Sequence, residues 1–178
     1  MADDEFPPDG QWIRAAVRRY EESLILYAQR LTGDLERGRD VAQETFLRLC
    51  SQKMEHVQTH LAEWLFSVAR NLALDMRRKE KRMTAMSSPQ MQARQTQDLG
   101  PAETAERSES AARVFDALDT LPENQQEVIR LKFQHGLSYK EISAVTSLSV
   151  TNIGFLIHTG LKAIREKVDV AVVAISRH

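Results

Sequence analysis

The sequence contains few of the residues that interrupt helices, favour sheets or form covalent cross-links. Its 178 residues include one cysteine, seven glycines, five prolines and 6% aromatic residues. The single cysteine, Cys50, excludes an internal disulfide framework, and we expect it to lie buried in a helix. No convincing run of alternating apolar and polar residues predicts a strand. The composition therefore predicts an all-α protein.

Signals for export or membrane insertion are also lacking. The N-terminus carries Asp3, Asp4 and Glu5 where a secretory signal has basic residues followed by an apolar run. The apolar stretch 168–175 is too short to span a bilayer, so we expect a helix end that docks on the protein. The sequence therefore predicts a cytoplasmic protein with no membrane insertion.

Patterns typical of catalytic or metal sites are missing as well. His56, His60 and Glu63 have the i, i+4, i+7 spacing of helical zinc ligands, but no glutamate adjoins the first histidine as in a zinc protease. No glycine-rich phosphate loop, nucleophile elbow or pair of catalytic carboxylates stands out. We therefore predict no enzymatic activity, no metal site and no cofactor.

What the sequence does contain is helical periodicity, in two blocks. At 42% hydrophobic residues, the chain can form one or two small helical domains. Before residue 83, three apolar stripes at helical spacing predict a three- to four-helix domain over residues 10–82. We expect its core to contain Ile13, Val17, Tyr20, Leu24, Tyr27, Leu31, Val41, Ala42, Phe46, Leu49, Leu61, Trp64, Leu65, Val68, Leu72 and Met76.

A linker and a second helical domain follow. Residues 83–101 lose the periodicity and are rich in Ser, Gln, Pro and Thr, which predicts a flexible linker. Periodicity resumes over 102–175, where Pro122 is expected in the first turn of a helix that Gly136 ends. The apolar positions of this part are Ala112, Phe115, Leu118, Val128, Leu131 and Phe133.

The net charge of −1 conceals strong segregation of charge along the chain. Residues 70–82 carry six basic and two acidic residues, whereas residues 83–127 carry three basic and eight acidic residues. The C-terminal part is basic again. Two basic blocks that flank an acidic middle suit a protein that contacts nucleic acid at two separated places, although solvated helix faces would explain both without a ligand.

The stretch 138–167 has the layout of a DNA-binding helix-turn-helix. Ser138 and Glu141 form a capping box at the start of the first helix, and Ser149 can cap the second. Such a pair suits the major groove, although any short helical hairpin packs similarly. On the second helix, we expect Val150, Ile153, Ile157 and Ile164 to pack inward, and Thr151, Asn152, Phe155, His158, Thr159 and Lys162 to face outward.

Two sets of motifs resemble the domains of bacterial sigma factors. The first set resembles the promoter-melting domain and consists of residues 40–49 (DVAQETFLRL), residues 64–75 (WLFSVARNLALD) and the basic residues 77–79. The second domain of that family is resembled by residues 121–129 (LPENQQEVI) and 136–142 (GLSYKEI). Because only these two domains are present, the chain resembles the compact extracytoplasmic-function (ECF) group.

The resemblance implies a function and a set of partners. A sigma factor binds core RNA polymerase, directs it to promoters and helps to open the DNA strands, while the chemistry stays with the polymerase. The implied partners are the clamp helices of the largest subunit, the flap of the second-largest subunit and promoter DNA, and an anti-sigma factor is a further candidate. A stand-alone helix-turn-helix regulator and a sigma-like interaction protein with weakened promoter reading are the alternatives.

The resemblance also implies which residues bind these partners. Those expected to contact core polymerase are Asp40, Gln43, Glu44 and Phe46. A base-capturing loop is implied near residues 53–60, and the residues expected at the minus-ten element are Lys53, His56, His60, Arg70, Asn71, Arg77, Arg78 and Lys79. Those expected at the minus-thirty-five element are Lys140, Ser149, Thr151, Asn152, Phe155, His158, Lys162 and Arg165.

One departure from the family pattern concerns the recognition helix. Gly154, Leu156 and Thr159 stand where family members usually carry basic residues. Asn152 can still read adenine, and Thr151 or Phe155 can touch thymine methyl groups. Alternatively, exposed Phe155 and Leu156 bury against the first domain or against a regulatory protein.

Overall fold

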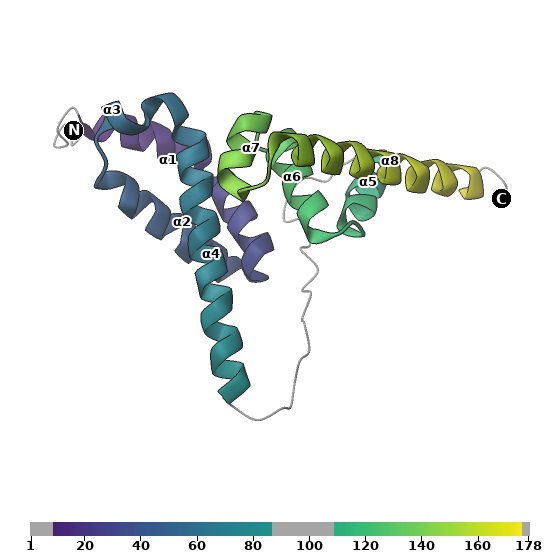
Figure 1. The fold of residues 1–178 in the computed structure, drawn as a ribbon, viewed down its shortest axis with the longest axis horizontal. Helices are drawn as coiled ribbons and strands as arrows, with labels where there is room; N and C mark the ends of the chain where they lie inside the picture. Colours follow the sequence, from purple (N-terminus) through teal and green to yellow (C-terminus); the bar gives the residue numbers. More distant parts are fainter. Residues whose placement is uncertain (1–8, 87–108, 176–178) are drawn as a thin grey trace. The chain divides into compact units, whose positions relative to one another are not determined.

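The computed structural model describes residues 9–86 and 109–175, where all the regular elements are helices (Figure 1). The predicted all-α fold is therefore confirmed. The chain divides into two compact units, Met1–Leu99 and Gly100–His178, which we describe separately. Most of the predicted linker, residues 83–101, lies outside the described residues, and so do Asp3, Asp4 and Glu5.

The first unit is a bundle of three long helices with a short helical segment between the second and third. Its elements are α1 (Asp9–Thr32), α2 (Leu35–Cys50), α3 (Met54–Val57), the 3-10 helix η1 (Gln58–His60) and α4 (Leu61–Met86). Gly33 has a φ of +79°, in the left-handed region that suits glycine, and it ends α1. Asp34 then caps α2, because its side chain accepts a hydrogen bond from the backbone N–H of Arg37 at 2.9 Å.

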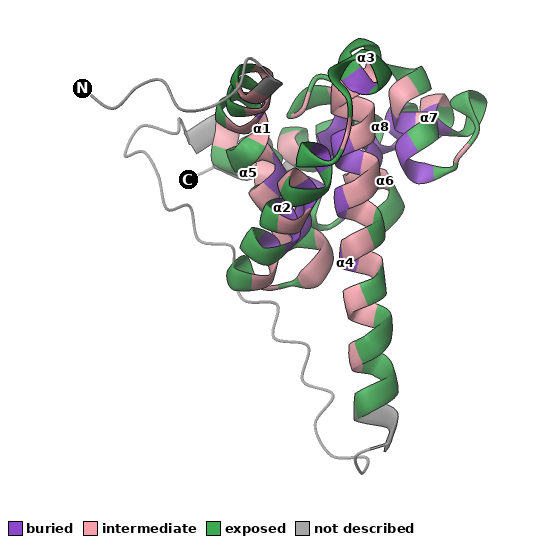
Figure 2. Cartoon of the chain, turned by 90° about the vertical axis from the view of Figure 1, so that its left-hand side faces the viewer, coloured by how far each residue is buried: buried purple, intermediate pink, exposed green. Residues whose placement is uncertain are grey.

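The core of the first unit lies between α1, α2 and α4 (Figure 2). Tyr27 of α1 meets Phe66 of α4 edge to face, with ring centroids 5.2 Å apart. Phe66 is fully buried, whereas Trp64, which the sequence predicts as a core anchor, is half-buried. The predicted core residues that are buried are Leu24, Tyr27, Val41, Ala42, Leu49 and Leu65, and the others are half-buried.

Gly38 fixes how closely α1 and α2 approach. A Cβ atom at this position would lie 2.9 Å from both the backbone nitrogen of Gln29 and the backbone oxygen of Ile25. Real Cβ atoms essentially never come this close to other heavy atoms, and backbone cannot move aside as a flexible side chain can. Glycine is therefore required here by the contact between the two helix backbones.

The second unit contains α5 (Glu109–Asp119), α6 (Glu123–Phe133), α7 (Tyr139–Thr146) and α8 (Val150–Ile175). Val128, Leu131, Leu137, Ile142 and Ile153 form its most deeply buried core. Three apolar positions expected to face inward are exposed: Ala112 on α5, Phe133 on α6 and Val150 on α8, the last two at 60% and 47%. Phe133 is the last residue of α6 and Val150 the first of α8, and at these helix ends the neighbouring elements no longer cover the apolar stripe. Pro122 occupies the N-cap of α6, one residue before the expected first turn.

A buried arginine holds the corner between α5 and α6. The Arg130 side chain is 3% exposed and forms an ion pair with Asp119 across that corner. Its second guanidinium nitrogen donates to Gln134 Oε1 at 3.5 Å. The pair compensates the cost of burying a charge, so it fixes the corner rather than adding much net stability.

No single helix in the described residues is long and apolar enough to cross a membrane. Helix α7 and residues 150–169 of α8 are long and apolar enough only when they are counted together, and the chain bends sharply between them. The sequence predicts that residues 168–175 dock on the protein. The side chains from Val170 onward lie outside the described residues, so this stays a prediction.

We predict that Gly38→Ala destabilises the first unit by about 1–3 kcal/mol, because the added methyl group forces the two helix backbones apart. Trp12 and Trp64 both lie in the first unit, so urea unfolding of the full chain followed by tryptophan fluorescence reports on this unit. Arg39→Ala, at the next exposed position, is the matched control and should change stability by less than about 0.5 kcal/mol. Equal stability of Gly38→Ala and the wild type would contradict the close-approach argument.

Candidate nucleic-acid and protein interfaces

One side of α2 forms a polar surface with an exposed apolar residue at its C-terminal end. Asp40, Gln43, Glu44 and Leu47 have the i, i+3, i+4, i+7 spacing that places them together, and we call this surface the α2 face. Asp40 and Gln43 are exposed, and Glu44 accepts a hydrogen bond from Arg48 Nε at 2.9 Å. Leu47 is 58% exposed. A face of this composition offers carboxylates and an apolar contact to a partner protein.

The sequence predicts Phe46 in this surface, but Phe46 is half-buried and lies at its edge. Helical geometry turns Phe46 about 100° away from Leu47. Leu47 is the residue that sequence reasoning missed, and its position seven residues after Asp40 was the available signal. The prediction for Cys50 is wrong: its side chain is exposed, because it follows Gln43 by two helical turns on the outer side.

The segment between α2 and α4 is helical rather than an open loop. Lys53 precedes α3, whose Val57 is 2% exposed and anchors the segment to the bundle. Lys53 and His56 are exposed, and His60 is half-buried with its Nδ1 atom 3.2 Å from Thr59 Oγ1. Within residues 9–86 and 109–175, no group of three or more His, Cys, Asp or Glu side chains is suitably placed to hold a metal ion.

The predicted minus-ten residues on α4 follow the helix toward its C-terminal end, which is mainly exposed (Figure 2). Two of the nearby charges are neutralised within the unit: Arg78 pairs with Asp75 at 3.0 Å, and Glu80 pairs with Arg37 of α2 at 2.5 Å. The exposed members of the set are Asn71, Arg78 and Lys79, and the half-buried members are Arg70 and Arg77. Lys81 and Arg82 add exposed cations on the same stretch, so this part of α4 can contact phosphates.

The helix-turn-helix predicted from sequence is present in the second unit. The backbone N–H of Ser138 donates to Glu141 Oε2 at 2.7 Å, and the backbone N–H of Glu141 donates to Ser138 Oγ at 3.2 Å, which confirms the capping box. Ser147 adopts a left-handed φ of +61° after α7. The Ser149 hydroxyl then accepts from the backbone N–H of Asn152 at 3.2 Å, so both helices begin at capped residues. The chain bends by 104° between α7 and α8.

The capping box also perturbs the ionisation of Glu141. The hydrogen bond with the Ser138 side chain lowers the pKa of this carboxyl below its ordinary value of 4.5, and a backbone hydrogen bond at Ser138 and the charge of Lys132 act in the same direction. Partial burial opposes them. The carboxylate therefore favours the folded helix most strongly when it is ionised.

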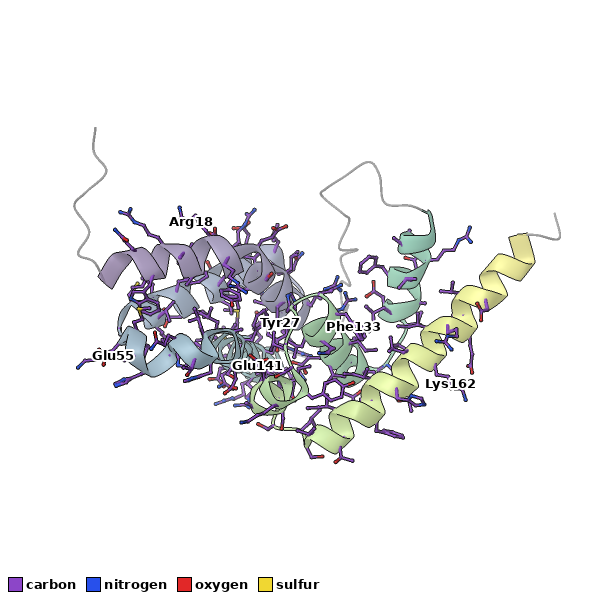
Figure 3. The ribbon with its side chains drawn as sticks, turned by 90° about the horizontal axis from the view of Figure 1, so that it is seen from above. Arg18, Tyr27, Glu55, Phe133, Glu141 and Lys162 are labelled. Carbon is purple, nitrogen blue, oxygen red and sulfur yellow. The ribbon has the colours of Figure 1, made fainter. Side chains whose placement is uncertain are left out.

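The exposed side of α8, which we call the α8 outer face, contains the residues predicted to read DNA. Thr151, Asn152, Phe155, His158, Lys162 and Arg165 are all exposed. Phe155 is 64% exposed, and Lys162 projects from the helix (Figure 3). Lys140 of α7 and the capping residue Ser149 are exposed as well.

Besides Val150, two residues of α8 differ from the sequence prediction. Leu156 is 7% exposed, so the adjacent exposed pair expected with Phe155 does not exist. Thr159 is half-buried: its hydroxyl donates to the backbone oxygen of Phe155 at 2.8 Å and accepts from Gln125 Nε2 of α6 at 3.1 Å. The helices packed against α8, which periodicity along α8 cannot reveal, account for both differences.

Two family models match the chain, one in each unit. Residues 16–83 match sigma-70 region 2, and residues 111–164 match sigma-70 region 4. The first match contains the α2 face and most of α4, and the second contains α6, α7 and the first half of α8. Both candidate surfaces therefore lie inside matched regions.

Curated relatives match across most of the chain. The ECF RNA polymerase sigma factor EcfG of Rhodopseudomonas palustris is 32% identical over 132 residues, which cover 74% of this chain and 71% of the relative. SigX of Bacillus subtilis is 28% identical, covering 84% and 80% of the two chains. SigE of Mycolicibacterium smegmatis is 29% identical over 84% of this chain, which spans 59% of that relative's length.

A solved structure has the same fold. It is the sigma factor RpoE in complex with the anti-sigma factor NepR from Bartonella quintana, with a TM-score of 0.67 and 19% identity. The similarity covers 90% of this chain and 98% of that one.

We predict that Glu141→Gln destabilises the second unit most at neutral pH. Because the folded-state pKa is lowered, the stabilisation is complete above the unfolded-state pKa near 4.5 and is lost as the pH falls through the folded-state value. The wild type and the variant should therefore converge in stability at acidic pH. Urea titrations at several pH values, followed by NMR signals of α7 in the full chain, measure this.

Glu166→Gln removes an exposed carboxylate of α8 and is the matched control. It should show no such pH-dependent difference from the wild type. A stability difference for Glu141→Gln that is independent of pH would contradict the assigned role of its charge.

Proposed function

The chain belongs to the ECF RNA polymerase sigma factors, and from this membership we propose how its two units divide the work. As a sigma factor, it binds core RNA polymerase and directs promoter-specific transcription initiation. In our proposal the first unit attaches to the core enzyme and handles the minus-ten DNA, while the second unit reads the minus-thirty-five element. The protein contributes binding energy and strand capture rather than chemistry.

The observation that carries the proposal is the composition of the α2 face. An exposed leucine that follows Asp40, Gln43 and Glu44 along the same side of α2 offers one apolar anchor beside a row of acceptors, which suits a basic or amphipathic protein surface better than DNA. Carboxylates would repel a phosphate backbone. We propose that this face binds the clamp helices of the largest polymerase subunit.

The cationic surfaces are assigned to DNA. Lys53, His56 and the exposed cations of α4 would contact the strands at the upstream edge of the melted region, where phosphate contacts give affinity without reading sequence. Bases flipped from the minus-ten element would lie near residues 53–60. The flap of the second-largest subunit is the proposed partner of the second unit.

Two alternative functions agree less well with the structure. A stand-alone helix-turn-helix regulator needs only the second unit and gives no role to the α2 face. A sigma-like interaction protein with weakened promoter reading was motivated by the shortage of basic residues on the recognition helix, a feature that the structure leaves in place. The exposed Phe155–Leu156 pair that would serve such a protein contact is absent, because Leu156 is buried. On family grounds we also propose action in the bacterial cytoplasm, where the polymerase acts, and regulation by an anti-sigma partner.

We predict that the combined variant Asp40→Ala, Gln43→Ala, Glu44→Ala abolishes run-off transcription from native promoters. Its affinity for core polymerase should fall at least tenfold, because the interface loses two carboxylates and an amide acceptor. Binding to fluorescent core enzyme and run-off transcription with reconstituted holoenzyme measure the two effects.

The control is Glu21→Ala, Glu22→Ala, which removes two exposed carboxylates from α1 instead. It should bind and transcribe as the wild type does. Specific transcripts from the triple variant at wild-type levels would contradict the proposed interface.

A further inference from the structure

The first two turns of the α8 outer face have an unusual chemistry for a DNA-reading helix. Positions 150–157 read Val-Thr-Asn-Ile-Gly-Phe-Leu-Ile and contain no charged residue. In a helix-turn-helix, the N-terminal residues of the second helix contact the base edges. Guanine is most often read by arginine or lysine, which offer two donors to its O6 and N7 atoms. This stretch contains neither residue.

We propose that this sigma factor reads A·T base pairs in its minus-thirty-five element, through Phe155 and Thr151 on thymine methyl groups and Asn152 on adenine. The proposal rests on the proposed function and specifies the DNA sequence class that the second unit recognises. Specificity then comes from apolar contact and one amide rather than from a charged donor.

Phe155 is exposed at a position from which its ring could contact base edges in the major groove. Its side chain is 64% exposed, one turn after the exposed Thr151 on the same side of the helix. The thymine methyl group is the one apolar feature of the major groove, and phenylalanine and threonine methyl groups are its usual partners. Burying the exposed ring against thymine methyl groups would be favourable, whereas guanine and cytosine offer it no methyl group.

Asn152 is held in the first turn by the cap of its own helix. Its backbone N–H donates to Ser149 Oγ at 3.2 Å, and its side chain is exposed. An asparagine amide can accept from N6 and donate to N7 of adenine, a bidentate match that guanine does not offer. Fixing the first turn reduces the entropy that this contact would cost.

The exposed cations of α8 lie beyond the base-contacting turns, toward its C-terminal end. Lys162 and Arg165 follow Phe155 by seven and ten residues, which is roughly 10 and 15 Å along the helix axis. Lys140 lies on α7, and all three side chains are exposed. This distribution separates phosphate contacts, which position the helix, from base contacts, which specify the sequence.

Packing does not impose the uncharged stretch. A Cβ atom at Gly154 would meet only the Tyr139 ring, at an ordinary 3.8 Å. Gly160 differs, because a Cβ atom there would come within 2.6 Å of Ile129 Cδ1. Close backbone packing therefore requires glycine at position 160 but not at position 154.

The surroundings of Phe155 favour DNA over a protein as its partner. Its neighbour Leu156 is buried, and the exposed residues nearest to Phe155 on this face are the polar Thr151, Asn152 and His158. A protein-binding hot spot would require a contiguous apolar centre. A single aromatic ring among hydrogen-bonding side chains, with cations at the edges, matches the major groove better.

The test measures binding of reconstituted holoenzyme to synthetic promoter fragments. Their sequences are those of native promoters that give run-off transcripts with the wild-type protein. Thymines of the minus-thirty-five element are replaced by deoxyuridine, which removes only the methyl group, and adenines by 7-deazaadenine, which removes N7. We expect deoxyuridine to weaken wild-type binding about tenfold and to weaken Phe155→Ala binding by a clearly smaller factor, because only Thr151 then contacts thymine methyl groups. Asn152→Ala should likewise lose its sensitivity to 7-deazaadenine.

Lys162→Ala is the control for a phosphate contact. It should weaken binding to all sequences alike and lower the slope of the salt dependence by about one. Phe155 is an exposed residue, so its replacement by alanine should leave the circular dichroism and core affinity unchanged. Wild-type binding that is insensitive to deoxyuridine, or that depends mainly on guanine N7 as probed with 7-deazaguanine, would overturn the proposal.

The two proposals fail in different ways. If wild-type protein neither binds core polymerase nor yields promoter transcripts, the sigma function itself fails. If transcripts form and Phe155→Ala gives the same base preferences as the wild type, only the A·T readout fails. Capture of a protein by the α8 outer face, lost in Phe155→Ala without any change in base preference, would assign this surface to a protein partner instead.

Discussion

The close approach of two helix backbones at Gly38 determines what the first unit can present to a partner. Because no side chain separates α1 from α2 at this point, the orientation of α2 about its own axis is fixed. Val41, Ala42 and Leu49 then turn into the core, and Asp40, Gln43 and Leu47 turn outward. The α2 face is thus a consequence of packing on its opposite side. When the groups of an interface are already held rigidly, binding causes only a small loss of conformational entropy.

The second unit positions its reading surface by a different means. Caps rather than backbone contact fix its two short helices: Ser138 and Glu141 begin α7, and Ser149 begins α8. Arg130 and Asp119 lock the corner before them. The first turns of α8 are therefore ordered before DNA arrives, as an accurate base-reading element requires. In our proposal the two units have complementary tasks: the first contacts protein and phosphates, and the second contacts base edges.

Sequence reasoning predicted what depends on local chemistry. The capping box at Ser138 and the cap at Ser149 follow from hydrogen-bonding groups within a few residues. It was less accurate where neighbouring helices decide. Leu156 is drawn inward by contacts that α8 alone does not encode, and Phe66, not Trp64, is fully buried between α1 and α4. Cys50 was misjudged because it lies on the outer side of α2, and Phe46, predicted for both the core and the polymerase contact, lies at the boundary between the two sides. The contacts of the proposed site residues with polymerase and DNA stay predictions.

The most direct test of the central claim, that the α2 face joins this chain to core polymerase, is site-specific photo-crosslinking. A photoreactive amino acid at position 43 would be activated in reconstituted holoenzyme bound to a native promoter, and the crosslinked subunit would be identified by mass spectrometry. The account predicts crosslinks to the largest polymerase subunit, and none from a probe at Glu22 on α1. Crosslinks from position 43 to promoter DNA, or none to any polymerase subunit, would contradict it.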